Sequence, residues 1–353
     1  MAKKKYYSIK NLLKTKAQYV IPLGQRSNGK SYSAKEEVIK YCYINNRKFV
    51  YLRRWKDDIK VNSVTAYFGD TPVDKITGGQ YDAIKAHGGY LYPVEYDGDG
   101  DNIKEIRGEI IGRYCSLNDA ERYKSQAFED YDFIIFEEFI TDGLYLADEP
   151  RRLQQFVSTV ARDRKITVIM IGNTINRVCP YFNEWSLDGV LKQKQGTIEI
   201  YHYHTEGGVV DIAVERCETI KQDATMFFGN SEKQIVAGEW EVHDFPHLQK
   251  KKEEYEMLYE LKIECQKFQF CMQLLADPET GGRFLFVYPL TTGREFERII
   301  ADWYADDPQI TNCFLTNRKV ERIMAELFRM DKIVFSDNLT GTDFKSCCQY
   351  LNL

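Results

Sequence analysis

Short apolar runs alternate with segments of helical periodicity along the first two hundred residues. Buried strands are predicted at four runs: 18–23, 48–54, 132–139 and 166–171. Helices are predicted over 30–45, where Val38, Ile39 and Cys42 lie on one face, and from Leu153 to Val160. Alternation of strands with helices is typical of an α/β fold in which a mostly parallel sheet is covered by helices.

Between residues 61 and 130 the periodicity weakens. Two strand-like runs, 89–92 and 109–113, flank the turn 97–102, and this pattern predicts an inserted β-hairpin. The acidic turn resembles a calcium loop, but Asn102 stands where the sixth position requires glycine, so a solvated hairpin tip is expected.

Past Tyr201 the sequence becomes more polar. We expect a first domain over 1–205 and a linker region over 206–240. A smaller C-terminal α/β domain is expected over 241–353. Its predicted elements are a helical segment at 249–265, strands at 268–272 and 283–287, and a helix at 318–329.

The segment 24–31 reads GQRSNGKS and fits the phosphate-binding pattern G-x-x-x-x-G-K-[ST] at every fixed position. Gly24 and Gly29 allow successive backbone N–H groups to face an anion, Lys30 neutralises phosphate, and the Ser31 hydroxyl can ligate Mg²⁺. A glycine turn between two core elements is the alternative. The predicted strand before the pattern and the predicted helix after it favour a P-loop for ATP and Mg²⁺.

Polar residues follow the other predicted strands at the edge where ligands bind in α/β sheets. Arg53 and Arg54 are therefore expected to meet phosphate. Of the adjacent Glu137 and Glu138, we expect the first to hold the Mg²⁺ shell and the second to polarise the attacking water. Asn173 can sense the γ-phosphate.

Arg162 ends the helix that runs through Leu153. It is either a basic residue favoured by the helix dipole or an arginine that reaches the γ-phosphate of a neighbouring subunit.

Composition narrows the class of protein. Nine scattered cysteines without a C-x-x-C pair argue against a disulfide framework and a cysteine zinc site. No long apolar run or signal peptide is recognised, so no membrane partner is expected and the cytoplasm is the default location. The net charge of −5 disfavours a nucleic-acid coat that works by bulk charge. The first 35 residues contain no acid, however, and form either a solubilising tail or a phosphate-facing patch.

The chain resembles the DNA-packaging motor ATPases of phi-29-like small tailed bacteriophages. The resemblance rests on GQRSNGKSY at 24–32, YLRRWK at 51–56, FIIFEEF at 133–139, VARDR at 160–164, IGNTINRVCPYF at 171–182 and AELFRM at 325–330. It implies a P-loop ATPase domain with a catalytic glutamate and an additional strand, followed by a domain similar to an inactive RNase H-type nuclease. In that domain we find only scattered candidate acids: Asp277, Asp302, Asp337 and Asp343.

The resemblance implies specific roles. The nucleotide-binding set is Gly24, Arg26, Gly29, Lys30, Ser31, Tyr32 and Asn173. Glu138 is implied as the catalytic glutamate, Arg162 as a trans arginine finger and Lys56 as a pore lysine that touches DNA. At the metal position the family usually has Asp, whereas this chain has the longer Glu137.

The resemblance also implies the partners. It implies a ring, five subunits by likeness, that acts on double-stranded DNA at the portal of an empty capsid. A structural packaging RNA is a further possible partner. The protein would be in the host cytoplasm and transiently at the procapsid portal vertex.

Two other functions stay open. A large terminase with an active C-terminal nuclease would need clustered carboxylates and divalent metal. A P-loop kinase or nucleotide-gated module would show no stimulation by DNA. Metal binding by His202 and His204, or by His243 and His247, is disfavoured because Pro246 interrupts the second pair and nothing else supports the first.

Overall fold

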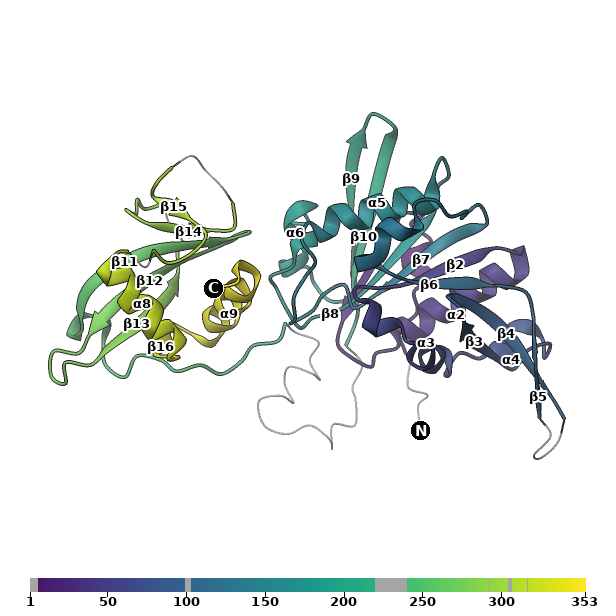
Figure 1. Cartoon of the computed structure of the whole chain (residues 1–353), viewed down its shortest axis with the longest axis horizontal. Coiled ribbons are helices and arrows are strands. Elements are labelled where there is room, and N and C mark those ends of the chain that lie inside the picture. The colour runs from purple at the N-terminus through teal and green to yellow at the C-terminus, as the bar shows by residue number, and fades with distance from the viewer. Residues whose placement is uncertain (1–5, 99–102, 220–239, 292, 304–306, 316) are drawn as a thin grey trace. The chain divides into compact units, whose positions relative to one another are not determined.

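A computed structural model describes residues 6–98, 103–219, 240–291, 293–303, 307–315 and 317–353 (Figure 1). The chain divides into two compact units. The first contains 1–141, 145–174 and 186–239, and the second contains 142–144, 175–185 and 240–353. Lys3, Lys4 and Lys5 of the predicted basic segment, and most of the predicted hairpin tip, lie outside the described residues.

The first unit is built on a sheet of ten strands among the described residues, in the order β3-β4-β6-β2-β7-β8-β1-β10-β9, with β5 paired to β4. The strands are β1 (Tyr19–Gly24), β2 (Lys48–Arg53), β3 (Ala83–His87), β4 (Tyr90–Asp97), β5 (Lys104–Arg107), β6 (Gly112–Ser116), β7 (Tyr131–Glu137), β8 (Thr167–Asn173), β9 (Thr197–Thr205) and β10 (Gly208–Arg216). The helices are α1 (Lys10–Leu13), α2 (Lys30–Asn45), α3 (Val61–Phe68), α4 (Val73–Thr77) and α5 (Glu149–Ala161), with 3₁₀ turns η1 (Lys56–Ile59), η3 (Leu117–Tyr123) and η4 (Val190–Lys192).

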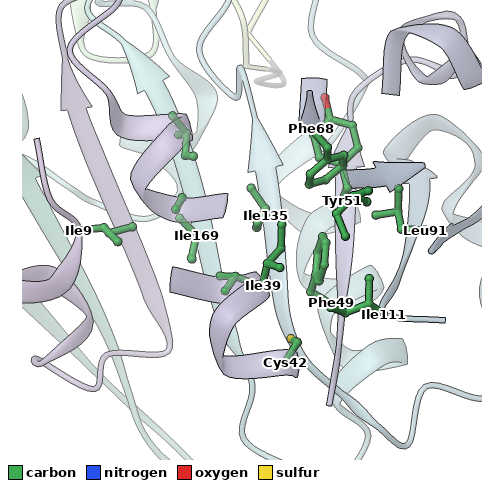
Figure 2. Packing of buried hydrophobic residues seen from close by; sticks show 14 of the residues in the cluster. Ile9, Ile39, Cys42, Phe49, Tyr51, Phe68, Leu91, Ile111, Ile135 and Ile169 are labelled. Atoms are coloured by element: carbon green, nitrogen blue, oxygen red, sulfur yellow. The ribbon is translucent and has the colours of Figure 1, made fainter. Parts of the chain in front are cut away.

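Alternation along the central strands divides their side chains between two faces of the sheet. Phe49, Ile135 and Ile169 belong to one buried cluster with Ile39 and Cys42 of α2, as Figure 2 shows. The intervening residues of these strands lie on the opposite face. The strands are buried on both faces, which explains their nearly continuous apolar runs.

The four predicted central strands and the two helices are confirmed, and the central pairs are parallel. The predicted hairpin is also present, because β4 pairs antiparallel with β5 and with the start of β6. The end of the sheet differs from expectation. Strand β10 lies within the predicted 206–240 linker, yet it pairs with β1 over five residues and extends with β9 as a hairpin (Figure 1).

The second unit has a sheet in the order β15-β14-β11-β12-β13-β16. Its elements are α6 (Pro180–Glu184), η5 (Lys252–Glu254), β11 (Glu256–Cys265), β12 (Phe268–Ala276), β13 (Arg283–Pro289), β14 (Ile299–Ala301), β15 (Ile310–Thr311), α8 (Lys319–Arg329), β16 (Ile333–Phe335) and α9 (Asn338–Leu351). Strands β11, β12 and β13 form an antiparallel meander, β14 and β15 are added in parallel beside β11, and β16 pairs in parallel with β13.

The helix predicted over 249–265 is wrong, because most of this segment is strand β11. Leu261, Ile263 and Cys265 are buried, while Lys262 and Glu264 between them are not. This is a period of two, which a lysine–glutamate mixture conceals when only composition is considered. The predicted strands at β12 and β13 and the helix at α8 are confirmed. No helix in the described ranges is long and apolar enough to cross a membrane.

Candidate functional site

The P-loop connects the buried strand β1 to helix α2. Gly29 is the N-cap of α2 and has a left-handed backbone with φ of 96°. A side chain there would be strained, and its Cβ would lie 3.3 Å from the Cβ of Tyr6. The Asn28 side-chain oxygen accepts a hydrogen bond from the Lys30 backbone N–H at 3.2 Å. The loop is therefore fixed by glycine geometry and by one of its own side chains.

The Lys30 ammonium is buried at the end of this loop. It donates to the carbonyls of Gly24 (3.2 Å) and Gln25 (2.6 Å), and to the side-chain oxygens of Asn28 (3.2 Å) and Asn173 (3.1 Å). All four oxygens belong to neutral groups, and burial lowers the pKa of Lys30 to about 8. A buried ammonium with neutral partners suits an anionic ligand, because an anion would restore the favourable charge balance that burial removes.

Glu137 is the last residue of β7 and is 6 % exposed. Burial raises the pKa of its carboxyl, while hydrogen bonds from Ser31 and Tyr67 act in the opposite direction. The Tyr67 hydroxyl donates to Glu137 Oε1 at 2.5 Å. The hydroxyl of Ser31 and the carboxylate of Glu137 thus lie together, and oxygen ligands of this kind are what Mg²⁺ prefers. These two residues fit the predicted metal site.

Glu138 follows directly but leaves the strand. Its φ is 56°, so its side chain does not alternate to the far face as the next strand residue would. The carboxylate is largely exposed and forms an ion pair with Arg53 at 2.7 Å. Adjacent strand residues point to opposite faces, so Glu137 and Glu138 can serve one site only if the chain leaves the strand between them, as it does here.

Arg54 differs from the prediction that it meets phosphate. Its side chain is buried and forms two hydrogen bonds with the Glu149 carboxylate, at 2.7 and 3.0 Å. It also donates to the carbonyls of Glu138 and Phe139, at 3.1 and 2.7 Å. Arg54 follows the last residue of β2, and its guanidinium is already occupied by Glu149 and these carbonyls. Arg54 holds the backbone that carries Glu138.

The other predicted nucleotide residues have varied positions. Asn173 ends β8 and binds the Lys30 ammonium, as a residue at that strand end should. Arg26 is exposed in the loop, and Tyr32 is 38 % exposed in the first turn of α2. Of these three residues, Asn173 contacts the P-loop lysine directly.

Arg162 and Lys56 lie outside this cluster. Arg162 is exposed and donates to the Gln126 carbonyl at 3.3 Å. It precedes β8, whereas Lys30 contacts the end of β8, and the seven residues of that strand span roughly 20 Å. Arg162 therefore lies at the other edge of the sheet from its own P-loop. Lys56 projects from η1, with its ammonium 3.8 Å from Asp119.

Sequence reasoning missed two contributors to the site. Tyr67 lies in the region of weak periodicity, and no motif indicates it. The chain before α1 is the other, because the Tyr7 N–H donates to the Asn28 carbonyl at 3.0 Å and the Ile9 N–H donates to the Ser33 hydroxyl at 3.0 Å. The lack of acids near the N-terminus was the available signal for a segment beside the P-loop.

The remaining candidate residues, as far as the structure describes them, do not gather into one cluster. His202 pairs with Asp211 at 2.7 Å, and the His247 ring bonds the Phe335 carbonyl. Within the second unit, the four candidate acids have different partners: Asp277 contacts Lys250, Asp302 accepts from Gln266 N–H, Asp337 caps α9 and Asp343 pairs with Arg177. Among the described residues, no group of three His, Cys, Asp or Glu could hold a metal ion.

Strand β8 lies between the P-loop strand β1 and the carboxylate strand β7. This order, with the phosphate-binding pattern after β1 and two carboxylates at the end of β7, is that of P-loop proteins with an additional strand between the P-loop strand and the carboxylate strand. The model of the Podovirus DNA encapsidation protein (Gp16) family matches residues 1–203. The chain belongs to this family, as the resemblance of its motifs predicted.

Similar proteins agree with this assignment. The DNA packaging protein of Bacillus phage phi29 is 26% identical over 186 residues, which are 52% of this chain and 50% of that protein. The DNA packaging protein of Bacillus phage B103 is 27% identical over 170 residues, 45% of each chain. The chain thus matches about half the length of these relatives.

Solved structures show that the fold is shared. The chain in the bacteriophage Phi-29 viral genome packaging motor assembly is 18% identical, with a TM-score of 0.54 and 95% of both chains covered. The chain in the Phi-28 gp11 DNA packaging motor is 17% identical, with a TM-score of 0.51 and 99% of both chains covered. The predicted fold class is confirmed.

Proposed function

We propose that this chain is an ATP-driven translocase that packages double-stranded viral DNA into a preformed capsid. The observation that carries the proposal is the meeting of Lys30, Ser31 and Glu137 at one sheet edge, with Glu138 beside them. Family membership and the packaging roles of the relatives support the same reading.

Each residue has a separate task in the proposed hydrolysis. Lys30 and the backbone N–H groups of the loop bind the β- and γ-phosphates of ATP. Ser31 and Glu137 hold Mg²⁺, which when bound neutralises charge on the transferred phosphoryl group. Glu138 accepts a proton from the attacking water, and its ion pair with Arg53 holds it in place before water arrives.

Arg162 is proposed to act in trans. Its position at the opposite edge of the sheet separates it from the P-loop of its own chain, whereas its exposure leaves it open to a neighbouring subunit. Family likeness indicates a ring of five subunits. In such a ring, Arg162 would stabilise the charge that develops on the γ-phosphate of ATP bound to the next subunit. The capsid portal is the proposed docking partner of that ring.

Lys56 is proposed to contact DNA. Its ammonium is exposed on η1, directly after β2 ends. A lysine at such a position binds phosphate as a point charge, and contacts to the DNA backbone accept every sequence. This suits a motor that must move along any base sequence.

The test measures ATP hydrolysis with and without double-stranded DNA. We expect DNA to stimulate turnover and Glu138→Gln to retain ATP binding while losing turnover by roughly 10²–10⁴-fold. Glu206→Gln, an exposed change in the turn after β9, is the matched control and should leave both unchanged. Undiminished turnover in Glu138→Gln would refute the assignment. Phosphate transfer to a small acceptor without DNA stimulation would instead support a kinase.

A further inference from the structure

Tyr67 contacts Glu137, although it belongs to neither the P-loop nor the carboxylate strand. Its hydroxyl, on α3, donates to Glu137 Oε1 at 2.5 Å. The Glu137 carboxylate is buried, so this bond is made in an environment that excludes most water. A hydrogen bond to a charged group is stronger than one between neutral groups, particularly at low local dielectric. Tyr67 is therefore able to restrict where the carboxylate lies.

Tyr67 is itself held by two other elements. Its ring stacks on Tyr51 of β2, with ring centroids 4.5 Å apart and an interplanar angle of 27°. The Lys35 ammonium, on α2, lies 4.3 Å from the ring centroid and also bonds the Tyr67 carbonyl. Lys35 lies one turn after Ser31 on the same helix. The hydroxyl is thus fixed relative to both the P-loop helix and the central sheet.

The metal carboxylate of the proposed site is a glutamate, Glu137. A glutamate side chain has one more rotatable bond than aspartate, so its carboxylate can occupy more positions around the strand end. Holding the longer side chain in one arrangement needs a further contact, and Tyr67 supplies it. Metal-ligating carboxylates are commonly oriented by such outer hydrogen bonds, whose loss weakens metal binding.

We propose that Tyr67 is a positioning residue whose hydroxyl fixes the Glu137 carboxylate for Mg²⁺ binding. This rests on the proposed ATPase function, because Mg²⁺ enters only with the nucleotide. The ring contacts of Tyr67 serve packing, and the hydroxyl serves the metal carboxylate. Replacement by phenylalanine separates these two contributions.

The first experiment compares Tyr67→Phe with Tyr43→Phe, in the full chain. Tyr43 also uses its hydroxyl in a hydrogen bond, to Gln80, away from Ser31 and Glu137. Binding of a fluorescent ATP analogue is measured against Mg²⁺ concentration and again in EDTA. We expect Tyr67→Phe to raise the Mg²⁺ concentration for half-maximal binding roughly tenfold or more, with binding in EDTA unchanged. Tyr43→Phe should change neither.

The second experiment repeats the pair of measurements in a Glu137→Asp background. The shorter side chain withdraws from Tyr67, so Tyr67→Phe should then have little further effect on the Mg²⁺ requirement. An equal loss in both backgrounds, or no loss with Glu137, would overturn the proposal. Because these binding measurements need no hydrolysis, the proposal can fail while the chain still hydrolyses ATP, and can hold if the chain does not.

Discussion

Each unit buries a cationic side chain, but the hydrogen-bond partners of the two cations differ in charge. In the first unit, the Lys30 ammonium contacts four neutral oxygens. In the second unit, Arg298 is fully buried and pairs with the buried carboxylate of Glu321 at 2.9 Å. Arg298 also donates to the carbonyls of Pro308 and Gln309 and to the Thr311 hydroxyl.

The difference separates a binding site from a structural anchor. A buried charge with a carboxylate and several hydrogen bonds is satisfied within the protein, so Arg298 fixes the loop before β15. A buried ammonium that meets only neutral oxygens keeps attraction for an external anion. The first unit contains both kinds, because Arg54 pairs with Glu149 as Arg298 pairs with Glu321.

The largest expected effect is on stability of the second unit. Arg298→Met removes the buried partner of Glu321, which keeps only the Leu315 N–H at 2.8 Å and the half-exposed Arg318 at 3.8 Å among the described residues. We expect a loss of about 3–5 kcal/mol in the free energy of unfolding. Chemical denaturation of the full chain measures it. Adding Glu321→Leu should recover much of the loss, because the uncompensated charge is removed. A loss below about 1 kcal/mol would show that the pair is not an anchor.

The next effect is on ligand binding. Lys30→Met removes an ammonium that donates its hydrogen bonds to neutral oxygens, so the unfolding free energy should change less than in Arg298→Met. Affinity for ATP should fall by on the order of 10²–10³-fold, because one charge of a buried pair is lost. Titration with a fluorescent ATP analogue tests this. ATP binding equal to that of the unmodified chain would contradict the comparison.

The pH dependence of ATP binding should show a smaller effect. Burial lowers the pKa of Lys30 to about 8 from the usual 10.5. ATP favours the ammonium, so affinity should fall as pH rises above about 8, at most about tenfold per pH unit. Without ATP, the unfolded chain binds more protons between pH 8 and 10.5, so the contribution of Lys30 to stability should rise there.

ATP titrations and chemical denaturation without ATP, each measured between pH 8 and 10.5, test the expected fall in affinity and the expected rise in stability. If Lys30→Met leaves the pH dependence of stability between pH 8 and 10.5 unaltered, the titration belongs to another group.

The smallest effect concerns Asp343 in the second unit. Burial raises the pKa of this carboxyl to about 6, although Arg177 lies 3.0 Å away and opposes the shift. The native state therefore binds more protons than the unfolded chain between about pH 4 and 6, and this contribution to stability is lost as pH rises through 6. The free energy of unfolding of Asp343→Asn, relative to that of the unmodified chain, should therefore be about 1 kcal/mol higher at pH 7 than at pH 5. Denaturation at both pH values measures the difference, and a constant difference would exclude this titration.

Sequence patterns predicted the first unit better than the second. The P-loop, the carboxylate strand and the Asn173 strand end are local, because each motif lies within one loop or directly after one buried strand. The composition of 249–265 predicts a helix where strand β11 lies, because Lys and Glu occupy the half-exposed positions between its apolar residues. Strand β10 lies within the predicted linker because its place in the sheet depends on pairing with β1, nearly two hundred residues earlier, which no local pattern indicates.

The sequence by itself determined which residues carry the proposed chemistry: a glycine loop with Lys30 and Ser31, and two carboxylates after a buried strand. Only the tertiary structure decided that Arg53 pairs with Glu138 and that Arg54 is buried against Glu149. It also decided that the Tyr67 hydroxyl reaches Glu137. The physical reason is distance along the chain. Motifs are set by backbone geometry over a few residues, whereas partners from other strands and helices are chosen by sheet order and strand alternation.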